Sequence, residues 1–229
     1  MDFTSAAFWA ALGSIIWVNV ILSGDNAVVI AMAARSLPAE QQKKAVFWGS
    51  AAAIVLRIIL TLIAAEMMRL SYLKIIGGLL LLYIGIGLLS GDDDDGDATH
   101  AGHGSLMNAV RTILVADLVM SLDNVLAVAA AAKGNVSLLV IGLALSIPLI
   151  IFGSTLLMKV MERFPVIIML GAALLGYLAG EMMITDPATV QRVGAQSHPV
   201  VIAVGLMGAA LVVTLGKLMQ GRKARAASV

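Results

Sequence analysis

The chain has 229 residues, of which 60% are hydrophobic and 13% are charged, and its formal net charge is +1. Because soluble domains carry about 25% charged residues, this composition excludes an ordinary soluble protein and predicts an all-α, polytopic membrane protein. Cysteine is absent, which excludes disulfide bonds and thiolate metal sites.

Seven apolar stretches are long enough to cross a bilayer, since a transmembrane helix needs about 20 mostly apolar residues. They cover residues 6–35, 46–66, 72–90, 106–132, 136–158, 165–184 and 199–219. The first and fourth are the longest, and they carry polar residues near their middles, which indicates helices that are broken or unwound there. Gly24 would permit a break in the first span, whereas Leu122 at the matching position favours a break less.

Lys and Arg residues outside the spans indicate how the chain is oriented, because cytoplasmic loops are enriched in them. On one side of a seven-span arrangement lie Arg35, Lys43, Lys44, Arg111, Lys159, Arg163, Lys217, Arg222, Lys223 and Arg225. On the other side lie Arg69, Lys74, Lys133 and Arg192. This bias predicts an N-terminus outside the cell and a C-terminus in the cytoplasm.

The polar residues of the first and fourth spans repeat at a constant spacing of 98 residues. The matched pairs are Asn19 with Asp117, Ser23 with Ser121, Asp25 with Asp123, and Asn26 with Asn124. The third and sixth spans align at a shift of 93 residues, which matches Gly78 with Gly171 and Gly87 with Gly180. Because each unit has three spans, the second unit must enter the membrane from the opposite side. This predicts an inverted 3+3 repeat plus one extra C-terminal helix.

The chain then divides into four segments. They are a first three-helix repeat (1–90), an acidic cytoplasmic loop (91–105), a second three-helix repeat (106–184), and a seventh helix with a basic cytoplasmic tail (185–229). The loop contains five aspartates with His100 and His103, and it is either a solvated disordered segment or a weak cation collector. Glycines in the third and sixth spans predict close helix packing; they are Gly77, Gly78, Gly85, Gly87, Gly171, Gly176 and Gly180.

Carboxylates inside a bilayer are costly, so those of the repeated motif mark a candidate functional site. We expect Asp25 and Asp123 to be the principal ligands of a cation, assisted by Asp117, Asn26 and Asn124. Asn19, Ser23 and Ser121 are further candidate oxygen donors. Carboxylate, amide, carbonyl and hydroxyl oxygens suit hard divalent cations such as Mg²⁺, Ca²⁺ and Mn²⁺. The alternative is that the aspartates only make hydrogen bonds between helices.

Arg57 lies near the centre of the second span and is a candidate for balancing charge. Three ionised aspartates carry −3 and Arg57 carries +1, so the remaining −2 matches one divalent cation. Between ion-binding events, Arg57 or protons on the carboxylates could limit the unpaired charge, which suggests metal/proton exchange. A purely structural ion pair is the alternative for Arg57.

Two stretches of this sequence resemble the TerC family, which is placed in the lysine exporter superfamily of membrane transporters. They are SGDNAVVIAMAARSLP at residues 23–38 and DLVMSLDNVLAVAAAA at residues 117–132, with the acidic loop between them. The resemblance implies a bacterial inner-membrane protein, and several members of the family export Mn²⁺. The acidic positions of the family correspond here to Asp25, Asp117 and Asp123, with Asn26 and Asn124 beside them.

The expected function is export of divalent metal ions, above all Mn²⁺, by alternating access at a mid-membrane Asp/Asn site. The metal is the transported substrate, and no resident cofactor is expected. Lipid is the expected surrounding, a homo-oligomer is possible, and no nucleic-acid partner is expected. An enzyme is not expected, because no nucleophile–base pair or nucleotide-binding loop occurs. The alternatives are an exporter of another solute (Ca²⁺ or a cationic amino acid) and a non-transporting scaffold for membrane-protein assembly or stress.

Overall fold

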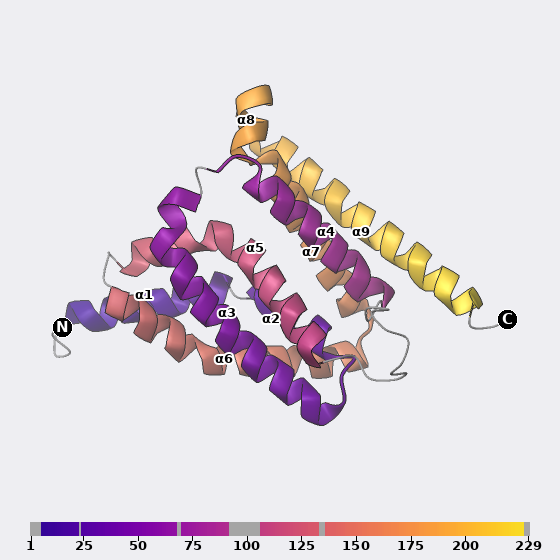
Figure 1. Ribbon diagram of the computed structural model, residues 1–229, viewed down its shortest axis with the longest axis horizontal. Helices are drawn as coiled ribbons and strands as arrows, with labels where there is room; N and C mark the ends of the chain where they lie inside the picture. The colour runs from indigo at the N-terminus through magenta and orange to yellow at the C-terminus, as the bar shows by residue number, and fades with distance from the viewer. Residues whose placement is uncertain (1–5, 23, 68–69, 92–105, 133–135, 227–229) are drawn as a thin grey trace.

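The computed structural model describes residues 6–22, 24–67, 70–91, 106–132 and 136–226. Within these ranges the backbone of Asn19 and Asp123 is described, but their side chains are not. Every regular element in the described residues is a helix, as predicted (Figure 1). The helices are α1 (Ala6–Leu22), α2 (Gly24–Ala34), α3 (Ala39–Met67), α4 (Leu73–Ser90), α5 (Leu106–Ala132), α6 (Val136–Arg163), α7 (Val166–Ile184), α8 (Pro187–Val193) and α9 (His198–Ala226).

Five of these helices are long and apolar enough to cross a membrane, so the chain is a multi-pass membrane protein. They are α3, α4, α6, α7 and α9. The expected first span corresponds to two shorter apolar helices, α1 and α2, and the fourth span corresponds to α5. The seven-span count therefore stays a prediction, although each expected span coincides with one helix or with a pair of helices.

The first and fourth spans differ in how the helix passes the repeated motif. α1 ends at Leu22 and α2 begins at Gly24, while Ser23 lies outside the described residues. In the first turn of α2, the side chain of Asp25 accepts a hydrogen bond from the backbone N–H of Asn26 at 2.8 Å. First-turn N–H groups lack partners within their own helix, so this bond is typical of a helix start.

In the fourth span the predicted break is wrong. α5 continues as a helix from Leu106 to Ala132, straight through the motif. Leu122 stands where the first copy has Gly24, and leucine favours a helix by close to 1 kcal/mol relative to glycine. The second copy of the motif therefore lies within one continuous helix, whereas the first copy falls where α1 and α2 meet, at the undescribed Ser23.

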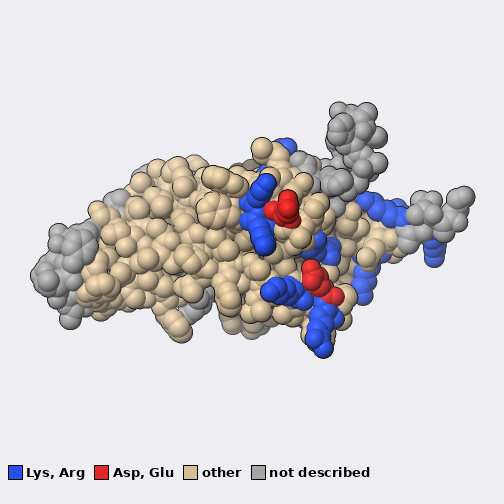
Figure 2. Space-filling model, turned by 90° about the horizontal axis from the view of Figure 1, so that it is seen from below, with Lys and Arg blue, Asp and Glu red and all other residues tan. Residues whose placement is uncertain are grey.

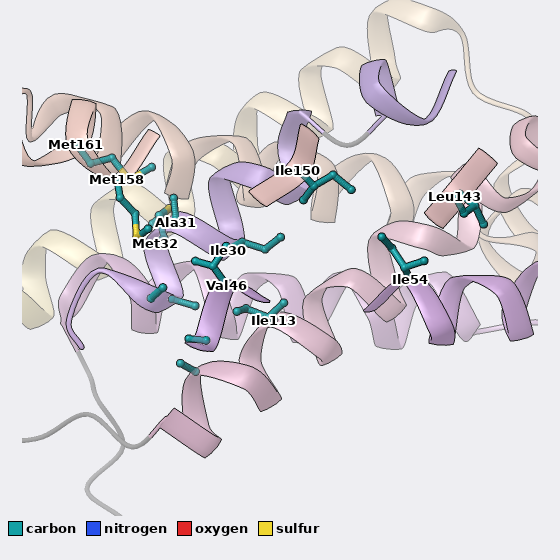
Figure 3. Close-up of a cluster of buried hydrophobic side chains, with 14 of the residues drawn as sticks. Ile30, Ala31, Met32, Val46, Ile54, Ile113, Leu143, Ile150, Met158 and Met161 are labelled. Carbon is teal, nitrogen blue, oxygen red and sulfur yellow. The ribbon is translucent and has the colours of Figure 1, made fainter. Parts of the chain in front are cut away.

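The helices form two groups (Figure 1). A bundle contains α1, α2, α3, α5 and α6, in which α3 packs on α5, and α6 packs on both α1 and α2. Figure 3 shows Ile30 of α2, Val46 of α3 and Ile113 of α5 meeting in the core of this bundle. A layer of α4, α7 and α9 lies beside the bundle and joins it mainly where α4 contacts α5 and α2 contacts α7.

Glycines permit close helix contact at several of the predicted positions. A Cβ atom on Gly176 of α7 would lie 2.4 Å from the backbone oxygen of Gly208 on α9, and one on Gly78 would lie 2.8 Å from the backbone oxygen of Ala179. At Gly87 the prediction is wrong, because a Cβ atom there would have no atom of the described residues within 4 Å. Two unpredicted contacts join helices of the bundle: Gly49 of α3 faces Ile113 of α5, and Gly142 of α6 faces Ile15 of α1.

Replacing Gly208 with alanine is expected to destabilise the contact between α7 and α9. Its Cβ atom would lie 2.1 Å from the backbone oxygen of Gly176, which neither backbone can accommodate without moving. Overpacking of this kind costs about 1–3 kcal/mol, or roughly 2–4 °C in Tm for each kcal/mol at this chain length. Thermal unfolding in detergent measures the shift. Gly153→Ala on α6 is the matched control, since no atom in the described part of the chain lies within 4 Å of its added carbon. Equal Tm values for both variants would contradict the close contact.

Asp186 connects the starts of two helices through hydrogen bonds, a role that the sequence analysis did not predict. Its side chain is fully buried and caps α8 by accepting the backbone N–H of Ala188 at 2.7 Å. It also accepts the backbone N–H groups of Tyr72 and Lys74, both at 3.0 Å, beside the first turn of α4. Tyr72 adopts a left-handed conformation with φ of 71°. One carboxylate thus fixes the start of α4 against the connection from α7 to α8.

Candidate functional site

A buried ion pair lies inside the bundle. Arg57 of α3 is the largest fully buried side chain among the described residues, at 2% exposure, and it forms a salt bridge with Asp117 of α5, which is 6% exposed. One guanidinium nitrogen, Nη2, donates to Oδ1 of Asp117. A charge in apolar surroundings is very costly unless it is paired and hydrogen-bonded, and this pair satisfies that requirement.

Ser121 completes the ion pair as a closed cluster. Its hydroxyl donates to Oδ2 of Asp117 at 3.2 Å, and Nε of Arg57 donates to the Ser121 oxygen at 3.0 Å. Asp117 and Ser121 are four residues apart on one helix, so they share a face. We call Arg57, Asp117 and Ser121 the ionic cluster. Both carboxylate oxygens of Asp117 are occupied within it.

Asp25 lies beside the ionic cluster at the start of α2. Its side chain is partly buried and lies close enough to Arg57 and Asp117 to interact electrostatically with both. The neighbouring Asn26 is 3% exposed. The positive end of the α2 dipole favours a carboxylate at this position. The structure thus brings together Asp25, Arg57 and Asp117, which come from three helices.

The remaining predicted residues are less completely described. Asn124 is partly buried on α5, three residues after Ser121 and therefore near the same face. The side chains of Asp123 and Asn19, and all of Ser23, lie outside the described residues, as does the acidic segment 92–105 with His100 and His103. Among the described side chains there is no group of three or more His, Cys, Asp or Glu that could hold a metal ion.

Two further buried polar side chains in the bundle were not predicted. Ser50 of α3 and Ser154 of α6 are fully buried, and in the described part of the chain neither hydroxyl has a hydrogen-bond partner. The two helices contact each other. A serine in an apolar span is common at packed helix interfaces, so residue type alone gave no signal at either position.

These features define a class: a multi-pass helical membrane protein with a buried ionic cluster and an adjacent carboxylate, which is transporter-like rather than enzyme-like. The chain belongs to the integral membrane protein TerC family, whose sequence profile matches residues 4–224. The resemblance that the two motifs indicated is thereby confirmed over nearly the whole chain.

Relatives in two bacteria are similar to this chain over most of its length. The uncharacterized membrane protein YjbE of Bacillus subtilis is 46% identical over 173 residues, which cover 75% of this chain and 78% of YjbE. The uncharacterized membrane protein YceF of the same bacterium is 26% identical, covering 78% of this chain and 72% of YceF. The UPF0053 inner membrane protein YgdQ of Escherichia coli is 22% identical, with 73% and 77% covered. No solved structure is significantly similar to the chain.

Proposed function

We propose that this TerC-family protein exports divalent metal cations from the cytoplasm and that Mn²⁺ is its main substrate. The observation that carries the proposal is Asp25, a partly buried carboxylate beside the ionic cluster, within apolar helices. Ionisable groups at such positions are characteristic of ion pathways. The choice of Mn²⁺ rests on the family resemblance, because an oxygen site alone also suits Mg²⁺ and Ca²⁺.

Asp25 and Asp123 are the proposed principal ligands, with the amide oxygens of Asn26 and Asn124 beside them. Asp25 and Asp123 occupy matching positions of the two repeats. Their combined charge of −2 balances one divalent cation. Asn19, Ser23 and Ser121 remain proposed as supporting oxygen donors. The loop with His100 and His103 is proposed only as a weak collector at the inner mouth.

The proposed architecture is seven spans arranged as an inverted 3+3 repeat, in which α1 and α2 together form the first span. Two glycine contacts support it. Gly49 of α3 faces Ile113 of α5, and Gly142 of α6 faces Ile15 of α1. The isoleucines are related by the 98-residue spacing, and the glycines are related by the 93-residue shift. The same contact thus occurs twice, once from each unit to the other.

Alternating access at such a site is proposed to involve the bundle and the α4–α7–α9 layer as the moving bodies. The two repeats do not separate as blocks, because α3 of the first packs on α5 of the second, and α6 of the second packs on α1 of the first. Fewer pairs of helices are in contact across the boundary between the bundle and the layer than across the boundary between the two repeats. A rocking motion along this boundary would disturb the smallest share of the apolar packing.

The proposed location is the bacterial inner membrane, with the N-terminus outside and the C-terminus in the cytoplasm. On the face that Figure 2 shows, the Lys and Arg side chains, with a few Asp and Glu among them, lie toward one end of the molecule, the end at which the C-terminus lies in Figure 1. Positive charge of this kind favours the cytoplasmic side. The printed name of the relative YgdQ places that protein in the inner membrane of Escherichia coli.

The ionic cluster argues against a cationic amino acid as the substrate. Such a substrate needs a group that binds its carboxylate, and Arg57 is the buried cation among the described residues of the bundle. Arg57 already donates to Asp117 and Ser121. Ca²⁺ export uses the same oxygen donors and stays an alternative. A scaffold role needs no intramembrane carboxylates, so it predicts that neutralising them leaves function intact.

The proposed function is tested in bacterial cells that lack their own manganese exporter. The cells are loaded with Mn²⁺ or Ca²⁺, the protein is expressed, and the residual metal is measured by mass spectrometry. We expect wild-type protein to lower cell manganese, and Asp25→Asn and Asp123→Asn to abolish this effect at equal expression. Unchanged manganese with the wild type, or normal export by both variants, would overturn the proposal. A fall in calcium alone would favour the Ca²⁺ alternative.

A further inference from the structure

We infer that Arg57 and Asp117 act as one neutral unit, so that Asp117 is a positioning residue and not a ligand of the transported ion. The inference rests on the proposed function and refines it. In this account the ion is held by one carboxylate from each repeat, Asp25 and Asp123. The Arg57–Asp117 pair sets the electrostatic surroundings of Asp25 without entering the coordination sphere.

The hydrogen bonds of Asp117 are the first support. Its Oδ1 accepts from the Arg57 guanidinium, and its Oδ2 accepts from the Ser121 hydroxyl at 3.2 Å. A divalent ion bound to either oxygen would lie next to the guanidinium, and like charges repel strongly in a low-dielectric interior. Release of Asp117 to the ion would instead leave Arg57 buried without its counter-charge, which is strongly unfavourable.

The repeat gives an independent second support. The partner position of Asp117 is Asn19, at the 98-residue spacing. The shift of 93 residues that relates Gly49 to Gly142 takes Arg57 to Ile150, an apolar residue that is 8% exposed. Both charges of the pair are therefore replaced together by uncharged residues in the other unit.

The carboxylates at Asp25 and Asp123 behave differently, because both units have one. If Asp117 were a ligand, the other unit would supply only the amide of Asn19 at the matching position. Leaving Arg57 and Asp117 out of the charge count does not change the net charge of the site. The charges of these two residues sum to zero, and Asp25 and Asp123 still give the site a net charge of −2. The symmetric residues thus account for the divalent charge, and the asymmetric pair supplies a local field.

That field has a specific effect on Asp25. Arg57 lies within electrostatic reach of Asp25, so its charge matters whenever it is not cancelled by Asp117. With Asp117 neutralised, Arg57 would attract Asp25 and repel an incoming cation. Asp117 therefore holds Arg57 away from the ligand, which is what a positioning residue does.

The test compares Mn²⁺ binding to purified full-length protein for the wild type, Asp117→Asn and the double variant R57I/D117N. Isoleucine and asparagine are the residues that the chain itself has at the matching positions, Ile150 and Asn19. We expect Asp117→Asn to weaken Mn²⁺ binding by about 10- to 100-fold, the usual cost of losing a group that supports a metal ligand. The double variant should regain most of this loss, because the uncompensated charge of Arg57 has gone with it. Isothermal titration calorimetry gives the affinities.

Recovery close to the wild-type affinity is not expected from a direct ligand role, because an ion that has lost a carboxylate ligand stays more weakly bound even when the charge of Arg57 is gone. If R57I/D117N binds Mn²⁺ as weakly as Asp117→Asn, then Asp117 is a ligand and the inference is wrong. R57Q/D117N serves as a second neutral pair with a polar side chain in place of Arg57. Failure of both double variants to fold would also overturn the inference, which holds that the pair is replaceable as a unit. Wild-type protein that binds no divalent cation would instead overturn the proposed function.

Discussion

Replacing Asp25 with asparagine is expected to weaken Mn²⁺ binding by about 100-fold or more. Removing a group that merely supports a metal ligand already lowers metal affinity by about 10- to 100-fold, and in this variant a proposed ligand itself loses its charge. The site would fall from −2 to −1, so one divalent cation would no longer be neutralised. The measurement is the rise in Tm that Mn²⁺ produces in the purified protein, since a ligand that binds only the folded state stabilises it.

The matched control for this variant neutralises a carboxylate far from the ionic cluster. Glu162 is exposed in the last turns of α6, and Glu162→Gln should leave the Mn²⁺-dependent rise in Tm unchanged. Asn replaces Asp25 with little change in size, so the variant is expected to fold. An Asp25→Asn protein that is stabilised by Mn²⁺ as strongly as the wild type would remove Asp25 from the site.

Replacing Asp186 with alanine is expected to lower the stability of the protein by about 3–5 kcal/mol. The carboxylate accepts N–H groups from Ala188, Tyr72 and Lys74. Hydrogen bonds to a charged group contribute about 1.5–3 kcal/mol each, and loss of a helix N-cap costs about 0.5–2 kcal/mol. These contributions overlap, and solvent reaching the freed N–H groups offsets part of the loss. Thermal or denaturant unfolding in detergent measures the change.

Two comparisons separate this structural role from a role in transport. Asp186→Asn keeps one oxygen acceptor and should lose clearly less stability than Asp186→Ala. Both proteins, when folded, should keep the Mn²⁺ affinity of the wild type, because Asp186 binds the starts of α4 and α8 and lies outside the ionic cluster. An Asp186→Ala protein with wild-type Tm would show that the carboxylate does not hold these helix starts together.

Most of the helices could be predicted from the sequence because apolar length alone defines a membrane span. The short helix α8 was missed, since it is not apolar enough to resemble a span and its start depends on Asp186. The shared face of Asp117 and Ser121 followed from helical spacing. The break expected in the fourth span did not occur: α5 is continuous from Leu106 to Ala132, and leucine at position 122 favours a helix.

The partner of Arg57 could not be predicted in the same way. Arg57 and Asp117 are on different helices, and only the packing of α3 on α5 brings them together. Sequence patterns report spacing along one helix and say little about which helices pack against each other. The charge of Arg57 was counted in the charge balance of the predicted site, but the pairing of Arg57 with one particular carboxylate came from the structure.

The central claim, that this protein transports divalent cations, is tested most directly by the flux of Mn²⁺ into proteoliposomes, because these vesicles contain no other protein. The full-length chain is reconstituted into liposomes that enclose a dye whose fluorescence is quenched by Mn²⁺. Protein-free liposomes and liposomes with Asp25→Asn protein are measured in parallel. We expect saturable quenching with the wild type, and with Asp25→Asn only the slow leak of protein-free liposomes. Wild-type quenching no faster than that of protein-free liposomes would contradict divalent-cation transport by this protein.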